Sequence, residues 1–256
     1  MNGNTPGVLF SFLSPVIYPK EEYIMFKTLK RLASALLIAA LISTSVFVTP
    51  AEAAGLSTPK NCHFVRWLDF SFSTFRVGWN LVNGANLYII ELAEADGSNA
   101  KYYESSKSYA TLPLTNTARV HKVRVCACKE DSSGKIVKIS NLSNTVFIIP
   151  SPTSLSGSMP DKTKLREKIK WNRVVGANGY NVFLSTNPKG TWYINKQTST
   201  SSATSVTIDK YRGAKFKKYT NYYIKIVSRR ILNGRYITVP TPTNFYTAVL
   251  KFYTTY

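Results

Sequence analysis

Three cysteines and two histidines are the residues of this chain whose types and positions we consider first for metal binding. Cys62 and His63 are adjacent, and Cys126 and Cys128 lie two residues apart, a spacing that places both on one face of a strand. These are the ligand types of a zinc site, but the spacing is not the C-x2-C of structural zinc sites. In an exported protein a disulfide from Cys62 to Cys126 or Cys128 is favoured over a metal. Three independent thiols are an equal alternative.

General acid–base chemistry has little support in the sequence. His63 and His121 are the two residues that could act as bases near neutral pH, and both fall in strand-like segments. Only 13 Asp and Glu stand among the 256 residues, and no G-x-S-x-G nucleophile motif is present. We therefore expect no catalytic residue, no cofactor and no resident metal, and we predict that the chain is not an enzyme.

One ten-residue stretch occurs twice. "WNLVNGANLY" runs from Trp79 to Tyr88, and "WNRVVGANGY" runs from Trp171 to Tyr180. Paired aromatic residues could stack on sugar rings, but each Trp and Tyr is in phase with the apolar face of its strand, which predicts a core role. The Gly-Ala-Asn between them is typical of a turn, because Gly and Asn tolerate positive φ angles. It is not a phosphate-binding loop, because no Lys-Ser/Thr follows it. The repeat therefore indicates duplicated architecture.

The elements that position these residues are predicted to be short strands. After residue 53 no long helical periodicity occurs, whereas short alternating runs are separated by Gly, Asn, Pro and Ser. In the first copy the predicted strands include 75–79, 88–92, 101–106, 108–114, 120–129, 136–142 and 144–150. In the second copy they include 169–171, 180–184, 205–211, 222–230 and 235–239, with a hairpin turn at Asn233-Gly234. Residues 150–162, "PSPTSLSGSMPDK", are expected to be the exposed linker.

The order of these motifs carries a family resemblance. A Trp on an early strand, a V-x-G-A-x-x-Y step and a late strand, Tyr222 to Ser228, resemble the fibronectin type III domain, particularly the tandem copies of bacterial extracellular proteins. The resemblance implies an all-β protein of two tandem immunoglobulin-like sandwiches, over residues 56–150 and 151–256. It also implies a core role for Tyr222 as a tyrosine corner. In the first copy His121 stands where the resemblance implies a Tyr, so the sequence does not predict a tyrosine corner for that copy.

The N-terminal residues have the pattern of a secretory signal peptide. Basic residues precede an uncharged run from Leu32 to Val48, and Ala51-Glu52-Ala53 supplies a cleavage site of small residues. We expect translation to start at Met25, cleavage after Ala53, and residues 1–24 to be an upstream misreading of the start. The uncharged run is short for a bilayer span, so no transmembrane anchor is expected after cleavage. These features predict a bacterial protein that is secreted or associated with the cell surface.

Positive charge is concentrated in the second unit. The chain has 33 Lys and Arg against 13 Asp and Glu; residues 54–150 have 11 against 7, and residues 151–256 have 18 against 3. Such an excess favours polyanionic partners, although a solvated surface that serves solubility is the other interpretation. The residues predicted to bind a polyanion are Lys210, Arg212, Lys215, Lys217, Lys218, Arg229, Arg230 and Arg235.

Together these features predict a non-catalytic extracellular protein for binding, adhesion or spacing. Its partner would be an anionic cell-envelope polymer, an acidic polysaccharide or another surface protein. Basic residues interleaved with aromatic ones can also hold single-stranded nucleic acid, but export argues against that partner. The alternative function is an accessory carbohydrate-associated module that works beside a separate polysaccharide-degrading enzyme.

Overall fold

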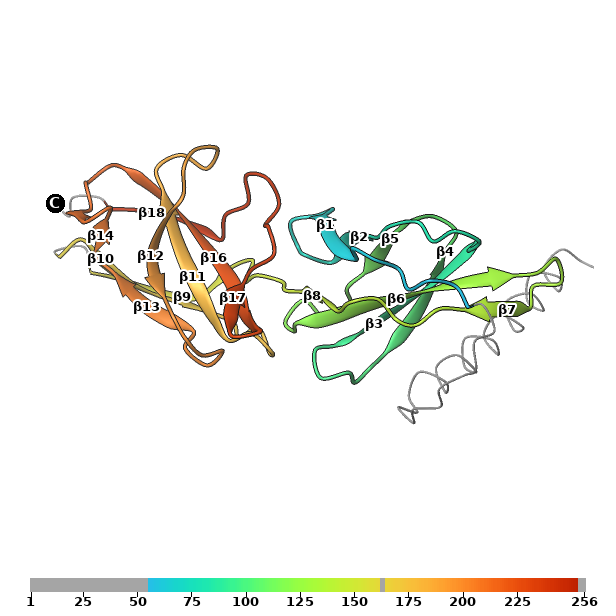
Figure 1. Cartoon of the computed structure of the whole chain (residues 1–256). Helices are drawn as coiled ribbons and strands as arrows, with labels where there is room; N and C mark the ends of the chain where they lie inside the picture. The colour runs from blue at the N-terminus through green and yellow to red at the C-terminus, as the bar shows by residue number, and fades with distance from the viewer. Residues whose placement is uncertain (1–54, 162–163, 253–256) are drawn as a thin grey trace, which may run out of the picture. The chain divides into compact units, whose positions relative to one another are not determined.

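The computed structural model describes residues 55–161 and 164–252 (Figure 1). The predicted signal peptide, including its start and cleavage site, lies outside the described residues. The described chain forms two β-sandwiches in sequence, and both belong to the same compact unit. None of its elements is a helix that could cross a membrane. The predicted all-β class and the tandem of sandwiches are therefore confirmed.

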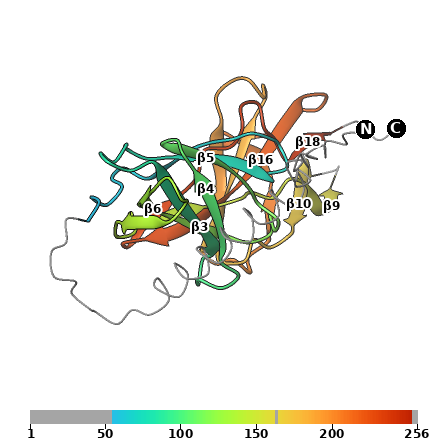
Figure 2. The ribbon, with the colours of Figure 1, turned by 90° about the vertical axis from the view of Figure 1, so that its right-hand side faces the viewer.

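The first sandwich places a three-stranded sheet, in the order β1-β2-β5, against a five-stranded one. The larger sheet has the order β4-β3-β6-β7, with β8 also paired to β6, and Figure 2 shows β3, β4 and β6 side by side. The strands of this sandwich are β1 (His63–Trp67), β2 (Thr74–Gly78), β3 (Leu87–Glu94), β4 (Lys101–Ser105), β5 (Tyr109–Pro113), β6 (His121–Glu130), β7 (Ile136–Ile139) and β8 (Val146–Ile148).

The second sandwich repeats this plan and adds a small hairpin. Its three-stranded sheet has the order β13-β10-β9, and its five-stranded sheet has the order β12-β11-β16-β17 with β18 also paired to β16. The strands are β9 (Leu155–Asp161), β10 (Arg166–Trp171), β11 (Gly179–Ser185), β12 (Tyr193–Gln197), β13 (Ser205–Ile208), β14 (Lys210–Tyr211), β15 (Ala214–Lys215), β16 (Asn221–Leu232), β17 (Arg235–Ile237) and β18 (Ala248–Lys251).

The apolar faces predicted from alternation are the faces that form the two cores. In β6, Val123, Val125 and Ala127 are fully buried in the core of the first sandwich. In β16, Ile224 and Ile226 occupy the equivalent core positions of the second. Because strand side chains alternate between faces, one long central strand in each sandwich fixes which residues face outward.

The linker prediction is partly wrong. Residues 155–161 form the strand β9, whose backbone pairs with β10 from Arg166↔Asp161 to Trp171↔Leu155. Ser, Gly and Pro made this segment look like a linker. However, β9 is an edge strand, and an edge strand tolerates Pro because one side of its backbone needs no ladder partner.

The hairpin predicted at Asn233-Gly234 is confirmed. Leu232 pairs with Arg235, and the two residues between them have φ angles of 51° and 75°. Both angles lie in the left-handed region that Asn and Gly tolerate, which is the requirement of a type I′ turn. This turn ends the long strand β16 and reverses the chain into β17.

Candidate polyanion-binding surface

The aromatic residues of the repeated stretch are structural in both sandwiches. Tyr88 and Tyr180 are 1% and 0% exposed, and each ring lies 5.3 Å from that of the Trp in its copy, Trp79 or Trp171. The Tyr88 hydroxyl accepts a hydrogen bond from the Val82 backbone N–H at 2.9 Å. The Tyr180 hydroxyl accepts the matching bond from Val174 at 2.8 Å. The predicted core role of these four aromatic residues agrees with this geometry, because all four side chains are buried in the cores.

The Gly and Asn of the repeat also have structural roles. Gly84 and Gly176 have φ angles of 81° and 83°, which an L-residue rarely adopts. Asn86 exchanges two 2.8 Å hydrogen bonds with the backbone of Glu130 at the end of β6. Asn178 accepts a 2.9 Å bond from the Ile231 N–H at the end of β16. Each turn is thereby tied to the central strand of its sandwich.

The tyrosine corner is present in the second sandwich and has a histidine counterpart in the first. Tyr222 is buried, and its hydroxyl accepts a 2.8 Å hydrogen bond from the Lys217 N–H. His121 is also buried, and its Nε2 lies 2.9 Å from the Asn116 carbonyl oxygen. Both bonds span five residues, so His121 secures the same corner with the opposite hydrogen-bond polarity.

Five of the predicted polyanion-binding residues gather at and just after the β14–β15 hairpin. All five are exposed, and Arg212 and Gly213 form the tight turn with φ angles of 53° and 81°. The guanidinium of Arg212 lies 4.5 Å from the centre of the Tyr193 ring, which holds the hairpin against β12. We call this group the hairpin cluster; it consists of Lys210, Arg212, Lys215, Lys217 and Lys218.

The other three predicted residues lie at the opposite end of β16, so the eight do not form one patch. Arg229 is 8% exposed, stacks 3.9 Å above the Tyr236 ring and donates hydrogen bonds to the Thr198 carbonyl. Arg230 donates to the Gly176 carbonyl and lies 4.4 Å from the centre of the Phe147 ring. Arg235 is exposed on β17. Arg229 follows Asn221 by eight residue steps of β16, roughly 26 Å along the strand. The sequence prediction of a single patch is therefore wrong, because composition alone does not specify that the length of β16 separates the two groups.

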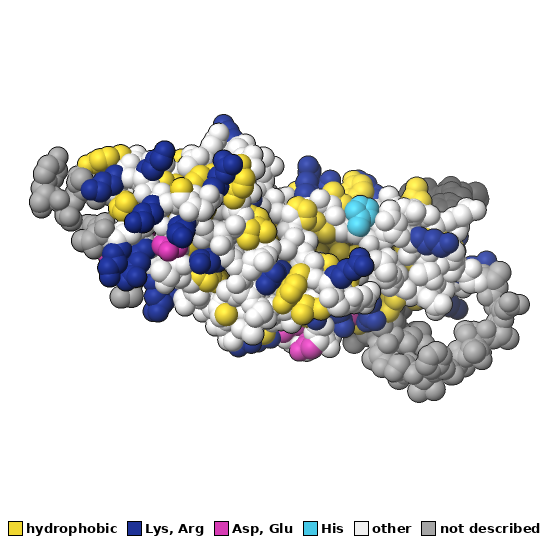
Figure 3. Space-filling model, turned by 60° about the vertical axis from the view of Figure 1, so that its left-hand side comes forward, with side chains coloured by type: hydrophobic (Ala, Val, Ile, Leu, Met, Phe, Trp, Pro, Cys, Tyr) yellow, Lys and Arg dark blue, Asp and Glu magenta, His cyan; other side chains and the backbone are white. Residues whose placement is uncertain are grey.

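Few acidic side chains offset this charge. Among the described residues after β9, Glu167 is buried and Asp209 is exposed beside the hairpin cluster, while Asp161 at the end of β9 pairs with Arg166 at 3.1 Å. Figure 3 shows Lys and Arg side chains gathered over the second sandwich, with few Asp and Glu among them. The hairpin cluster is therefore an exposed and largely uncompensated concentration of positive charge.

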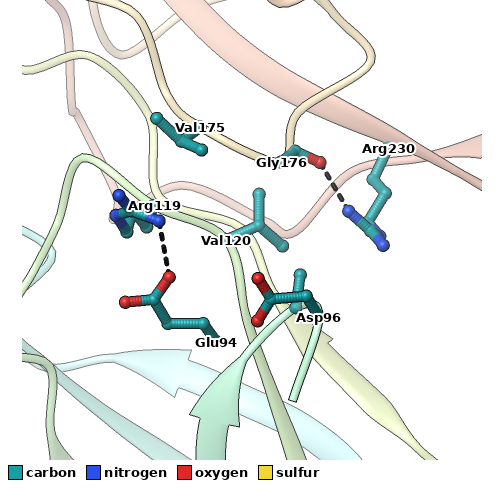
Figure 4. A pocket seen from close by; sticks show the side chains of 8 residues that line it. Glu94, Asp96, Arg119, Val120, Val175, Gly176 and Arg230 are labelled. Atoms are coloured by element: carbon teal, nitrogen blue, oxygen red, sulfur yellow. Dashed lines mark hydrogen bonds and ion pairs between the residues drawn. The ribbon is translucent and has the colours of Figure 1, made fainter. Parts of the chain in front are cut away.

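A small pocket between turns has its charges already engaged (Figure 4). It holds about 180 Å³, and its lining includes Glu94 at the end of β3, Arg230 on β16 and residues of three connecting segments, 95–96, 119–120 and 175–176. Arg119 pairs with Glu94 at 2.6 Å, and Arg230 reaches the Gly176 carbonyl. Beside it, Val120 donates to the Val175 carbonyl and Val175 donates to the Ala118 carbonyl, both at 2.8 Å. The two arginines that line the pocket are therefore engaged by partners within the chain.

The cysteines are three free, buried thiols, which agrees with the alternative of three independent thiols, and the predicted disulfide is wrong. Cys62 belongs to the core of the first sandwich, whereas Cys126 and Cys128 lie on the opposite face of β6 from the core residues Val125 and Ala127. The sheet therefore separates Cys62 from both possible partners. Burial raises the pKa of the Cys62 thiol, which keeps it protonated. No group of three or more His, Cys, Asp or Glu able to hold a metal ion occurs in the part of the chain that the structure describes.

Comparison with known proteins gives only structural likenesses. No protein-family model matches the sequence, and no curated protein matches it. The chain is similar to a segment of two fibronectin type III domains from chicken tenascin, with 15% identity, a TM-score of 0.34, and 75% of this chain and 98% of that chain covered. It is also similar to the fn3 domain of human collagen alpha-1(XX) chain, with 14% identity, a TM-score of 0.33, and coverages of 43% and 99%. The fold itself is shown by the strand order, which packs a three-stranded sheet and a five-stranded sheet in each sandwich.

Proposed function

We propose that this chain is a non-catalytic extracellular binding or spacer protein whose second sandwich contacts an anionic polymer. The observation that supports the proposal is the hairpin cluster, in which five exposed cations lie within nine residues next to a single exposed carboxylate. Concentrated charge of one sign attracts a polymer of the opposite sign and raises its rate of association. The first sandwich, with 11 basic and 7 acidic residues, supplies no comparable excess.

The partner we propose is an anionic envelope polymer or an acidic polysaccharide, and the place is the outside of a bacterial cell. The signal-peptide pattern of residues 25–53 supports export. N-terminal sequencing of the exported protein is expected to begin at Ala54. Retention of the chain inside the cells would contradict the proposed location.

Binding of the mature chain to polyphosphate and to polygalacturonate across a salt series tests the function. We expect the triple variant Lys215→Ala, Lys217→Ala and Lys218→Ala to bind both polymers at least tenfold more weakly at low salt. The matched control removes the same charge from exposed lysines of the first sandwich: Lys101→Ala, Lys135→Ala and Lys138→Ala. Equal losses in the two triple variants, or binding that salt does not weaken, would show that the hairpin cluster is not the contact.

A further inference from the structure

The five-stranded sheet of the second sandwich has an outer face rich in aromatic side chains. Phe183 on β11 and Lys225 on β16 are directly opposed in the sheet register. Their neighbours Val182, Leu184 and Ile224 are buried in the core, so Phe183 and Lys225 point away from it. We call this surface the outer aromatic face; it consists of Phe183, Trp192, Tyr223, Lys225 and Tyr246, with Ile194 and Val249 beside them.

Lys225 lies at the centre of this face between two rings. Its ammonium is 4.3 Å from the centre of the Trp192 ring and 5.5 Å from that of Phe183. Burial lowers the pKa of Lys225, because part of its hydration has been replaced by apolar rings. None of the ion pairs of the described residues involves Lys225, and the five strands of this sheet contain no Asp or Glu. The ammonium is thus held in place without a carboxylate partner.

Further apolar and aromatic surface surrounds this centre. The Tyr223 and Tyr246 rings lie 5.2 Å apart in an edge-to-face arrangement. Tyr246 is 42% exposed, and Val249 and Ile194 on the flanking strands are 47% and 53% exposed. At one edge, the Gln197 side-chain amide donates a 2.9 Å hydrogen bond to Asn181. A contiguous exposed apolar surface with a few polar groups is typical of a binding site.

We propose that the outer aromatic face binds the sugar rings of an acidic polysaccharide, with Lys225 receiving a carboxylate of the polymer. This inference rests on the proposed function, contact with an anionic polymer. It adds that the polymer is recognised by its sugar rings as well as by its charge. The C–H groups of a sugar ring are complementary to the negative face of an aromatic ring. A carboxylate that reaches a partly desolvated ammonium forms a strong charge-assisted hydrogen bond.

The composition of the face favours a polysaccharide over the other occupants. One cation lies among four aromatic rings, which suits a chain of rings whose carboxylates are spaced apart. A nucleic acid strand carries one phosphate per nucleotide and is held by denser positive charge along its backbone. A second copy of this chain would bring another Lys225 and the same excess of cations to the interface, which would repel.

Titration of the mature chain with oligogalacturonate, its methyl ester, polyphosphate and oligo-dT tests the proposal. We expect oligogalacturonate to change the fluorescence of Trp192, because Trp67, Trp79 and Trp171 are buried in the cores. Tyr246→Ala and Lys225→Met are each expected to weaken oligogalacturonate binding about tenfold, equivalent to about 1.4 kcal/mol. Polyphosphate binding is expected to remain unchanged in both variants, and the methyl ester is expected to bind the wild type more weakly than the acid.

Tyr109→Ala is the matched control, since Tyr109 is 38% exposed in the first sandwich and also lies beneath a cation, Arg76, at 4.8 Å. It is expected to leave binding of every probe unchanged. Unchanged oligogalacturonate affinity in Tyr246→Ala and Lys225→Met, together with loss in the hairpin triple variant, would overturn this proposal while the proposed function stands. Tighter binding of oligo-dT than of oligogalacturonate, or self-association through this face, would also overturn it. Failure of every polyanion to bind would instead overturn the proposed function.

Discussion

At the scale of single residues, the repeated stretch is explained by hydrogen bonds that its sequence does not display. Its Trp and Tyr could be assigned to the core from strand phase alone. The specific role of the Tyr, however, is that its hydroxyl accepts a hydrogen bond from the backbone N–H six residues earlier, that of Val82 or Val174. Such a bond depends on how the turn folds back, which alternation of apolar residues does not specify.

Removal of the Tyr180 hydroxyl is therefore expected to destabilise the second sandwich. Tyr180→Phe leaves the buried Val174 N–H without its partner and also removes the bond to the Ser201 carbonyl at 3.2 Å. An unsatisfied buried donor costs about 1–3 kcal/mol. Urea unfolding of the variant measures the loss, with the exposed Tyr109→Phe as a control expected to change stability by less than about 0.5 kcal/mol. Equal effects of the two changes would contradict this role.

Glu167 on β10 predicts a dependence of stability on pH. The side chain is 4% exposed, and burial raises the pKa of its carboxyl above the ordinary value of 4.5. The folded state therefore retains the proton to a higher pH than the unfolded state. The stability of the wild type falls as the pH rises from about 4.5 through the raised value.

Glu167→Gln removes this titration, because glutamine stays neutral. The stability of the variant relative to the wild type is expected to be greater at pH 7 than at pH 4. Urea unfolding at both pH values measures the difference. A relative stability that is the same at the two pH values would show that Glu167 does not retain its proton in the folded state.

At the scale of elements, the close approach of β11 to Thr198 gives a sharp prediction. Gly179 has a φ of 150°, and a Cβ at this position would lie 2.1 Å from the Thr198 carbonyl oxygen. Gly179→Ala must therefore displace backbone and is expected to lower the free energy of unfolding by about 3 kcal/mol or more.

Gly213 provides the control. It lies in the β14–β15 turn, has open space around it and has a φ of 81°. Gly213→Ala is expected to cost only the strain of a left-handed residue, about 1–2 kcal/mol. Thermal or urea unfolding compares the two, and similar costs would contradict the structure of this strand pair.

The strands that could be predicted are those with a clear apolar alternation, such as β6 and β16. β9 could not, because its pairing uses backbone groups of a segment rich in Ser, Gly and Pro. The sequence predicts a strand over 205–211 followed by basic residues, and it does not predict the β14–β15 hairpin, although Arg212-Gly213 between two short segments is a turn signal. The outer aromatic face could not be foreseen, because Trp192 and Lys225 are far apart in the sequence and meet only when β12, β11 and β16 align.

At the scale of the whole molecule, the two sandwiches share one architecture and differ in charge. Architecture accounts for Trp79, Trp171 and their partners in the repeat, whereas the hairpin cluster and the outer aromatic face have no equivalent in the first sandwich's sequence. The cysteines likewise belong to the first sandwich alone. Because the shared residues serve the architecture, we assign the proposed polymer contact to the second sandwich, where the two copies differ.

A hydrogen-exchange footprint of the mature chain with and without polygalacturonate tests this central claim most directly. The account predicts slower exchange at residues 210–218 and along β12 and β16, with exchange in the first sandwich unchanged. Added salt is expected to remove the protection, because the contact is electrostatic in part. Protection confined to the first sandwich, or no protection at polymer concentrations that bind the chain, would contradict the account.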